Sequence, residues 1–338
     1  MALAGSLERA REHRARTSGD GMWKTARVPE PADSDEAPLP TGAGRPTVIY
    51  VMGAGRSGST ILGVALGNCE NVFFAGELDR WLPKCGIPRG DPSPERARFW
   101  SDVREEIDDA AELFGGKTTY LERSSALFDP RKWPARRRLR GRYRRVSEEL
   151  YQAIQRVTGV PNIVDTSHYP LRARELRALG GVELHLLFLV RDPERVVASL
   201  GREDVPERTF GVLTANAYLW LTYLLSVLVF LRHPRDRRLF VRYEQFVADP
   251  EGVMAQILEG RCSDVRLPPD LESLRTGVPF HGNRLVKSEV VALESPSDSS
   301  PRSRGLTTFL QLPWTAVFAL LRPAVRASTA AGRSRSSR

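Results

Sequence analysis

The sequence is poor in the residue types that build disulfide frameworks and metal sites. It contains three cysteines and five histidines among 338 residues. Cys69, Cys85 and Cys262 are odd in number and form no C-x-x-C pair, which argues against both kinds of site. The N-terminal residues are rich in Arg and Glu and lack the apolar stretch of a signal peptide. We therefore expect a cytoplasmic protein with free thiols and no bound metal.

A lysine is missing from the most informative stretch of the chain. Residues 47–60 read TVIYVMGAGRSGST, an apolar strand followed by a glycine-rich turn and a hydroxyl pair. Gly53 and Gly58 have the spacing of a Walker A loop, but Ser59 stands where that loop has its lysine. The positive charge comes earlier, at Arg56. Backbone N–H groups of such a turn bind anions, so the stretch predicts a phosphate site but argues against ordinary ATP hydrolysis.

Acidic residues are fewer than basic ones, 41 against 50, which gives a formal net charge of +9. This excess predicts an anionic partner. Much of it is local, because residues 131–145 hold nine Lys and Arg. For this block we weigh a solvated or substrate-facing surface, a membrane surface and nucleic acid. Nucleic acid is the least favoured, because few aromatic residues are interleaved and no recognised motif is present.

Long apolar runs are also scarce, and residues 215–231 form the one that invites a membrane test. The run is about 17 residues long, the lower limit of a spanning helix, and it contains Asn216, Thr222 and Ser226. We expect a buried core helix here and keep membrane contact as the alternative. A second apolar helix is expected over residues 310–321.

Strand-like apolar runs alternate with helical segments, which is typical of a parallel α/β sheet. Strands are predicted over residues 47–52, 71–74, 162–165, 182–190 and 238–242. Helices are predicted over residues 60–66, 146–157, 171–179, 194–200 and 250–258. We expect a P-loop-like three-layer domain over residues 46–294, with an irregular, partly helical insertion or lid over 86–145. Residues 1–45 are expected to form a disordered N-terminal segment. Residues 295–338 are expected to add a linker, a short apolar helix and a basic disordered tail.

Phosphate-binding residues follow the predicted strand ends, where parallel sheets gather their ligands. Arg191 ends the strongest strand, and Ser199 lies eight residues further on, in the next helix. Such a pair is able to hold one phosphate from two sides.

The glycine-rich loop and the Arg191 segment together resemble the sulfotransferases that use 3′-phosphoadenosine-5′-phosphosulfate (PAPS). The loop is similar to the 5′-phosphosulfate loop of the carbohydrate, tyrosylprotein and bacterial branches, Arg-Ser-Gly-(Ser/Thr)-Thr. The second segment is similar to the family's 3′-phosphate motif, Arg-Asp-Pro followed by a serine. The resemblance covers roughly residues 46–290 and implies a PAPS-dependent enzyme that needs no metal.

The resemblance also implies which residues bind the donor. The loop would hold the 5′-phosphosulfate, the Arg–Ser pair the 3′-phosphate, and a tyrosine would lie near the adenine. Arg284 lies in a segment similar to the family's Gly-Asn-x-x-Arg, with the register of the match left open. Either this arginine or Lys287 would close over the nucleotide. The implied donor residues are Gly55, Arg56, Ser57, Gly58, Ser59, Thr60, Arg191, Ser199, Tyr243 and Arg284.

Three residues are expected to act on the reaction itself: Arg56, Glu77 and His168. Glu77 matches the carboxylate that takes the acceptor's proton in the carbohydrate and tyrosylprotein branches, with Asp79 as runner-up; burial would have to raise its pKa for this task. His168 stands where many bacterial relatives have a lysine that steadies the sulfonate. It could donate a hydrogen bond or be charged at slightly acid pH, and it could also signal a changed acceptor or lost activity.

The preferred interpretation is transfer of the PAPS sulfonate to a hydroxyl of a carbohydrate, glycolipid or secondary metabolite, by in-line displacement. The partner is then a small-molecule or glycolipid acceptor, with peripheral membrane contact as an open addition. Two alternatives remain. One is a P-loop kinase that uses Mg-ATP, and the other is a catalytically inactive nucleotide-binding or membrane-associated interaction protein.

Overall fold

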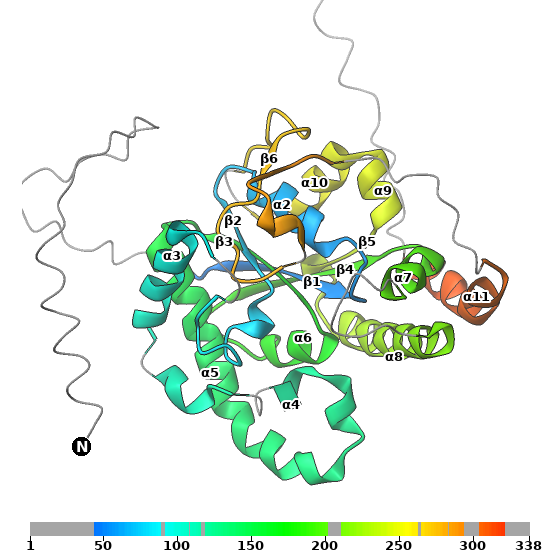
Figure 1. Ribbon diagram of the computed structural model, residues 1–338, viewed down its shortest axis with the longest axis horizontal. Helices are drawn as coiled ribbons and strands as arrows, with labels where there is room; N and C mark the ends of the chain where they lie inside the picture. The colour runs from blue at the N-terminus through cyan, green and yellow to red at the C-terminus, as the bar shows by residue number, and fades with distance from the viewer. Residues whose placement is uncertain are drawn as a thin grey trace, which may run out of the picture. The chain divides into compact units, whose positions relative to one another are not determined.

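The computed structural model describes residues 44–88, 92–107, 109–115, 119–201, 211–262, 265–282, 284–293 and 304–321. The predicted N-terminal disorder and the basic tail therefore lie almost wholly outside the described residues. One parallel sheet forms the centre, with strand order β2-β3-β1-β4-β5 (Figure 1). The strands are β1 (Thr47–Gly53), β2 (Val72–Gly76), β3 (Asn162–His168), β4 (Glu183–Val190) and β5 (Arg238–Arg242). All five predicted strands and the predicted fold class are confirmed.

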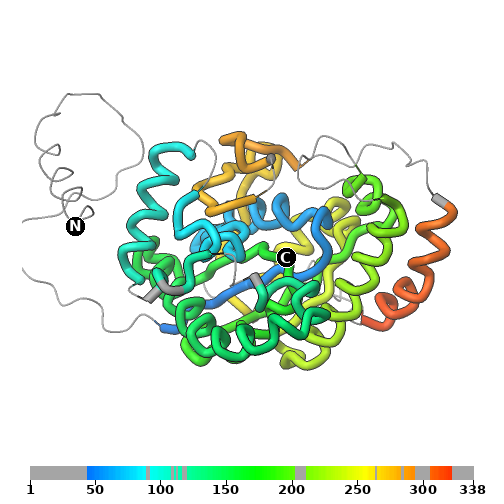
Figure 2. The backbone as a smooth tube through the Cα atoms, turned by 60° about the horizontal axis from the view of Figure 1, so that its bottom comes forward, coloured from blue at the N-terminus to red at the C-terminus, as the bar shows by residue number. Residues whose placement is uncertain are grey.

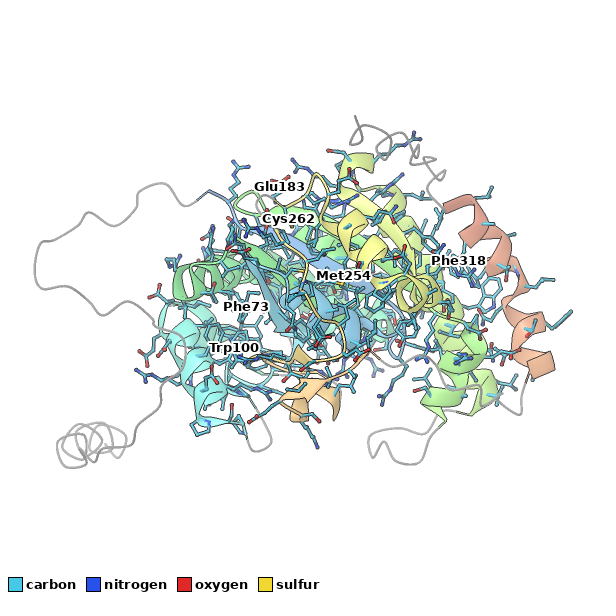
Figure 3. All side chains as sticks on the ribbon, turned by 90° about the horizontal axis from the view of Figure 1, so that it is seen from above. Phe73, Trp100, Glu183, Met254, Cys262 and Phe318 are labelled. Carbon is cyan, nitrogen blue, oxygen red and sulfur yellow. The ribbon has the colours of Figure 1, made fainter. Side chains whose placement is uncertain are left out.

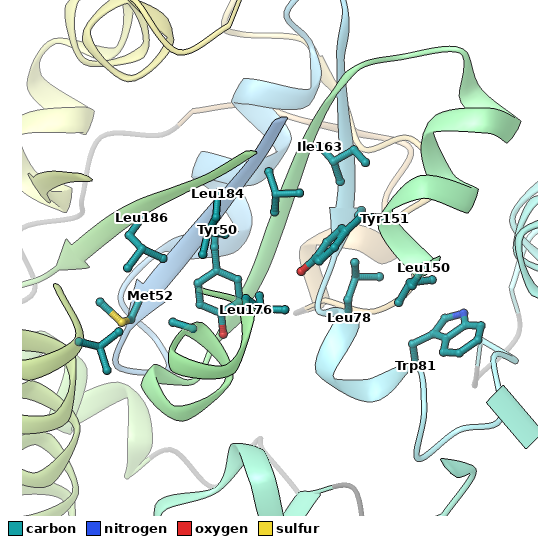
Figure 4. Close-up of a cluster of buried hydrophobic side chains, with 14 of the residues drawn as sticks. Tyr50, Met52, Leu78, Trp81, Leu150, Tyr151, Ile163, Leu176, Leu184 and Leu186 are labelled. Carbon is teal, nitrogen blue, oxygen red and sulfur yellow. The ribbon is translucent and has the colours of Figure 1, made fainter. Parts of the chain in front are cut away.

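The central strand β1 explains why its sequence is an unbroken apolar run. Alternate side chains of a strand point to opposite faces, and here both faces are covered. Val48, Tyr50 and Met52 belong to the hydrophobic cluster on one face, part of which is shown in Figure 4. Ile49 and Val51 belong to the cluster on the other face. The sheet is thus the middle of three layers.

Helices connect the parallel strands and form the two outer layers, since parallel neighbours need crossover connections. One face is covered by α3 (Pro94–Glu105), α5 (Trp133–Thr158), α6 (Pro170–Leu176), α7 (Pro193–Leu200) and α8 (Val212–Leu231). The other is covered by α2 (Ser59–Gly67), α9 (Tyr243–Ala248) and α10 (Pro250–Leu258). Short helical turns are η2 (Leu78–Arg80), η3 (Asp109–Leu113), α4 (Thr119–Glu122), η5 (Ser124–Leu127), η6 (Pro130–Lys132), η7 (Arg235–Arg237) and η8 (Arg284–Lys287).

The insertion is more regular than its sequence suggests. Residues 133–145 were expected to be irregular, but they continue into the predicted helix 146–157 as one helix of 26 residues, α5. Arg136, Tyr143 and Leu150 are buried along its inner side. Because arginine supplies part of this buried side, the apolar periodicity that marks a helix is hidden in the sequence.

Helix α11 (Arg304–Leu321) packs at one end of the domain, beside α7 and α8 (Figure 2). Its Phe318, labelled in Figure 3, contacts Phe188 of β4 and Tyr223 of α8, with ring centroids 5.9 and 5.0 Å apart. Among the described residues α8 is long and apolar enough to cross a membrane, yet only 39% of its most apolar stretch is buried. The predicted core helix is therefore also a surface helix.

A segment near residue 280 crosses the carboxyl end of β2. Phe280 N donates to Ala75 O at 2.9 Å, and Glu77 N donates to His281 O at 2.8 Å. A small antiparallel pair, β6 (Leu274–Arg275) and β7 (Val290–Val291), flanks this segment on either side in sequence. Late residues of the chain are thereby held against the edge of the sheet that carries the early glycine-rich loop.

Candidate active site

Two glycines shape the loop at the carboxyl end of β1. Gly53 has φ +153°, and a Cβ atom there would lie 2.2 Å from the carbonyl oxygen of Leu189 on β4. Gly58 is left-handed, with φ 91°, and its Cβ would lie 2.2 Å from the ring of Tyr243. Only glycine fits either position without displacing its neighbour. The loop is therefore pressed tightly between β4 and the start of α9.

The loop leads directly into the N-terminus of α2, which has the properties of an anion site. Gly58 is the N-cap residue and has no side chain to cap the first N–H groups, and no acidic residue lies in the first turn. Ser57 is buried, and its Oγ has no hydrogen-bond partner among the described residues. Ser59 and Thr60 are the first two residues of the helix. These groups offer several donors at one place.

Arg191 follows β4 and lies over this loop. Its guanidinium is 4.6 Å from the centre of the Tyr243 ring, and its Nη1 donates to the carbonyl oxygen of Arg56 at 3.3 Å. Its Nε is buried without a hydrogen-bond partner among the described residues. The structure thus joins Arg56, Arg191 and Tyr243 from the ends of β1, β4 and β5. Ser199 lies in the last turn of α7 and is partly buried, and its shared grip with Arg191 stays a prediction.

Asp192 has a structural task that the sequence did not reveal. Its carboxylate accepts hydrogen bonds from Glu194 N and Arg195 N and so caps α7. Its own N–H donates to Glu244 Oε1 at 2.7 Å. These three bonds fix the backbone immediately after Arg191, so the Arg-Asp-Pro sequence sets the direction in which the guanidinium leaves the strand.

Glu77 comes directly after β2 and is paired with a histidine from far along the chain. Nδ1 of His281 lies 3.0 Å from Glu77 Oε2, and both side chains are partly buried. Burial acts to raise the pKa of Glu77, but the hydrogen bond from His281 and the nearby Arg80 outweigh it. The pKa of Glu77 is therefore lowered, not raised as the sequence interpretation required. The sequence had shown His281 only as part of a motif.

His168 lies beside the loop, whereas Asp79 lies in the core. His168 ends β3 with φ 55°, its ring lies 4.4 Å from that of Tyr169, and its Nε2 would lie 3.9 Å from a Cβ on Gly55. Burial lowers the pKa of His168, so the expected charge at slightly acid pH is not supported. Asp79 is buried, which raises its pKa, and its backbone N–H donates to Ser167 Oγ. Asp79 lies within the core, and Glu77 is the more accessible carboxylate.

A small cleft, with a volume of about 30 Å³, opens beside the loop, between the end of β3 and α8. Its lining includes Gly53, His168, Tyr169, Tyr218, Thr222 and Leu225. Tyr218 also contacts the loop, because its hydroxyl accepts a hydrogen bond from Gly55 N at 3.0 Å. The cleft therefore borders the loop on the side of His168.

The late segment brings two further predicted residues to this edge. Lys287 is exposed at the end of η8, while the side chain of Arg284 lies outside what the structure describes. A Cβ on Gly282 would lie 3.6 Å from Thr60 Cγ2, which places this segment beside the start of α2. Closure over a nucleotide by Arg284 or Lys287 stays a prediction. Among the described residues no group of three or more His, Cys, Asp or Glu forms a metal site.

Comparison with known families decides the class of protein. A model of the sulfotransferase family matches residues 46–260, which run from the strand before the loop to the end of α10. The chain belongs to the sulfotransferase family. Both segments around Arg56 and Arg191 lie inside the match, as does Glu77. A search of curated proteins finds no match.

Solved structures similar to this sulfotransferase are bacterial-type sulfotransferases at low identity. The sulfotransferase domain from the curacin biosynthetic pathway is 18% identical, covering 80% of this chain and 98% of its own, with a TM-score of 0.44. The corresponding domain of the Synechococcus PCC 7002 olefin synthase is 18% identical, with 84% and 98% coverage and a TM-score of 0.47. A sulfotransferase from Alicyclobacillus acidocaldarius is 13% identical, with 82% and 92% coverage and a TM-score of 0.36. The family assignment rests on the family match.

Proposed function

We propose that this sulfotransferase moves the sulfonate of PAPS to a hydroxyl group of a small-molecule or glycolipid acceptor in the cytoplasm. One observation carries the proposal: a lysine-free phosphate loop lies under an arginine, and buried polar atoms of both lack partners among the described residues. Those atoms are Ser57 Oγ and Arg191 Nε. Buried polar atoms are normally hydrogen-bonded, so unpaired ones at a helix N-terminus support an anionic ligand.

In this proposal the donor is held at both of its charged ends. The N–H groups of the loop, with Arg56, Ser59 and Thr60, bind the 5′-phosphosulfate. Arg191 binds the 3′-phosphate together with Ser199. Tyr243 lies under Arg191 and beside Gly58, where its ring offers a surface for the adenine.

The transfer is an in-line displacement at sulfur. The acceptor oxygen forms a bond to sulfur while the bond from sulfur to the 5′-phosphate oxygen breaks, and 3′,5′-adenosine bisphosphate leaves. Arg56 and the loop stabilise the negative charge that grows on the leaving phosphate. Glu77 takes the hydroxyl proton. Because the pKa of Glu77 is lowered, its carboxylate is ionised at neutral pH. Proton transfer to this carboxylate becomes favourable only as the new oxygen–sulfur bond makes the hydroxyl proton acidic.

The acceptor enters through the cleft beside the loop. His168 lies on this route with Nε2 toward Gly55, and as a neutral imidazole it is able to donate one hydrogen bond to a sulfonate oxygen. The cleft has room for little more than a hydroxyl group, and its polar lining residues offer that group hydrogen-bond partners.

Ligand-dependent thermal unfolding separates this function from an ATP-dependent kinase. A ligand that binds only the folded state stabilises it, by about 2.7 kcal/mol at one hundred times its dissociation constant. We expect 3′,5′-adenosine bisphosphate to raise the melting temperature, and 2′,5′-adenosine bisphosphate to serve as the matched control with a smaller shift. If Mg-ATP raises the melting temperature and the 3′,5′ compound does not, the proposed donor is wrong.

A further inference from the structure

Helices α8 and α11 bury several polar side chains and expose many large apolar ones. Asn216 Nδ2 donates to Thr307 Oγ1 at 3.2 Å, and Gln311 Nε2 donates to Asn216 Oδ1 at 2.8 Å. All three side chains are buried, as are Thr222 and Ser226 of α8. In a helix that faces water on its outer side, polar residues belong outside. Here Asn216, Thr307 and Gln311 hold the two helices together.

The outward sides of both helices are occupied by large apolar residues. We call this set the outer face: Leu213, Trp220, Leu224, Leu228 and Leu231 of α8, with Leu306, Phe309, Leu312 and Leu320 of α11. Leu213, Phe309 and Leu320 are 68%, 73% and 86% exposed. The α8 members recur at the three- and four-residue spacing of one helix stripe, and residues 212–231 and 305–321 contain no charged residue. An exposed set of large apolar residues of this kind marks an interaction site.

Trp220 joins the two stripes. Its Nε1 donates to the carbonyl oxygen of Leu310, and its ring lies 5.1 Å from that of Trp314. The inner sides of both helices are packed against the domain, through Tyr218 at the loop and Phe318 at β4. A helix attached in this way cannot cross a bilayer, but it can lie on one.

The charge of the surrounding sequence identifies the partner. Residues 301–338 contain seven arginines and no Asp or Glu. Arginines that flank an apolar helix in the sequence, with a tryptophan exposed on the apolar face, are a combination that favours interfaces rich in anionic lipid.

We propose that the outer face docks this sulfotransferase on a bilayer that contains anionic lipids, with α8 and α11 lying in the plane of the interface. Apolar side chains enter the headgroup region, and the arginines of the C-terminal sequence pair with lipid phosphates. This inference concerns binding and does not depend on the proposed donor or acceptor.

Vesicle co-sedimentation of the full chain tests the proposal. We expect binding to vesicles of phosphatidylglycerol with phosphatidylcholine, and at least about tenfold weaker binding for Leu224→Glu/Leu228→Glu, because each leucine loses its buried apolar area. Replacing Arg322, Arg326, Arg333, Arg335 and Arg338 by Gln should reduce binding to the anionic vesicles by about fivefold for each arginine that reaches the surface.

Ile87→Glu is the matched control, since Ile87 is an exposed apolar residue outside the outer face. It should bind vesicles like the unmodified chain, and the melting temperatures of all variants should agree. The proposal is overturned if the chain binds no anionic vesicle, or if Ile87→Glu weakens binding as much as the α8 pair. It is also overturned if light scattering shows a dimer that the α8 variant dissociates, because a second copy would then cover the outer face.

Discussion

Two arginines of this molecule follow the same sheet and use their charge in opposite ways. Arg172, on α6, is 1% exposed, and its N–H groups are hydrogen-bonded to other groups within the fold. Its Nη1 donates to Glu122 Oε1 at 3.2 Å and to Tyr143 OH at 2.6 Å, while Nη2 and Nε reach Asp165 Oδ2 at 3.3 and 3.4 Å. Arg191 donates to one carbonyl, stacks on a ring and keeps a buried Nε without a partner among the described residues.

The comparison shows how a fold separates structural charge from charge meant for a ligand. Around Arg172, two carboxylates and two tyrosine hydroxyls neutralise and saturate the guanidinium, and its pKa is raised by these neighbours despite burial. Around Arg191, the loop and Tyr243 fix the position of the cation without neutralising it. A buried ion pair is costly to break, whereas a positioned but unsaturated cation costs stability until an anion arrives.

The largest effect that this contrast predicts is on stability. Arg172→Ala should lower the free energy of unfolding by about 3–5 kcal/mol, because it leaves Glu122 and Asp165 buried without their cation. Urea unfolding measures the change. A variant with Arg172→Met, Glu122→Gln and Asp165→Asn should recover most of the loss. Equal stability of Arg172→Ala and the unmodified chain would show that the network does not hold the fold.

The next effect is on catalysis at Glu77, which follows the neighbouring strand β2. Glu77→Gln should lower turnover of PAPS by about 10²–10³-fold, since it removes the proton acceptor, and should leave affinity for 3′,5′-adenosine bisphosphate unchanged. Initial rates and calorimetric titration provide the two measurements. Unchanged turnover would remove Glu77 from its assigned role. If the unmodified chain turns over none of the hydroxyl acceptors tested, the alternative of a catalytically inactive nucleotide-binding protein is favoured.

His281→Gln refines this result. The hydrogen bond from His281 lowers the pKa of Glu77, so its loss should raise that pKa and move the acid limb of the kcat/KM profile to higher pH. The sign also applies to stability: a carboxylate with a lowered folded pKa stabilises the fold above its unfolded pKa, and this contribution disappears as pH falls. An unchanged acid limb would show that another group controls it.

The smallest effect separates binding from folding. Arg191→Ala should weaken binding of 3′,5′-adenosine bisphosphate by about 10–100-fold, in line with the loss of a charge-assisted contact, while the free energy of unfolding changes by less than about 1 kcal/mol. Arg235→Ala, an exposed arginine of η7, is the matched control for both measurements. If Arg191→Ala destabilises the fold as Arg172→Ala does, the two arginines do not differ in the way described here.

The sequence predicted the sheet and the loop because both depend on local patterns. Each strand is an apolar run bounded by glycine, proline or polar residues, and the loop is a contiguous motif at the end of one of them. The pairing of Glu77 with His281 spans 204 positions and has no local signature. The buried Arg136 and Arg172 escaped prediction for a related reason, because a charged residue is assigned to the surface unless its partners are known.

Helix α8 shows a further limit of sequence patterns. Its long apolar run predicted a helix over residues 215–231, and the structure confirms one. Periodicity does not say which stripe turns inward, and here the side with Asn216 and Ser226 is buried. Asn216 finds its partners Thr307 and Gln311 on a helix that follows much later, so the sequence of α8 alone does not reveal them.

The hydrogen bond between Gly55 N and the Tyr218 hydroxyl links α8 to the donor loop. That N–H group belongs to the loop proposed to bind a phosphate, so the phenol and the donor compete for it. A donor phosphate that takes this N–H group would have to displace the Tyr218 hydroxyl, so the two contacts would weaken each other by the same factor. Removal of the hydroxyl by Tyr218→Phe would then be felt as tighter donor binding, although α8 itself does not touch the nucleotide in the proposal.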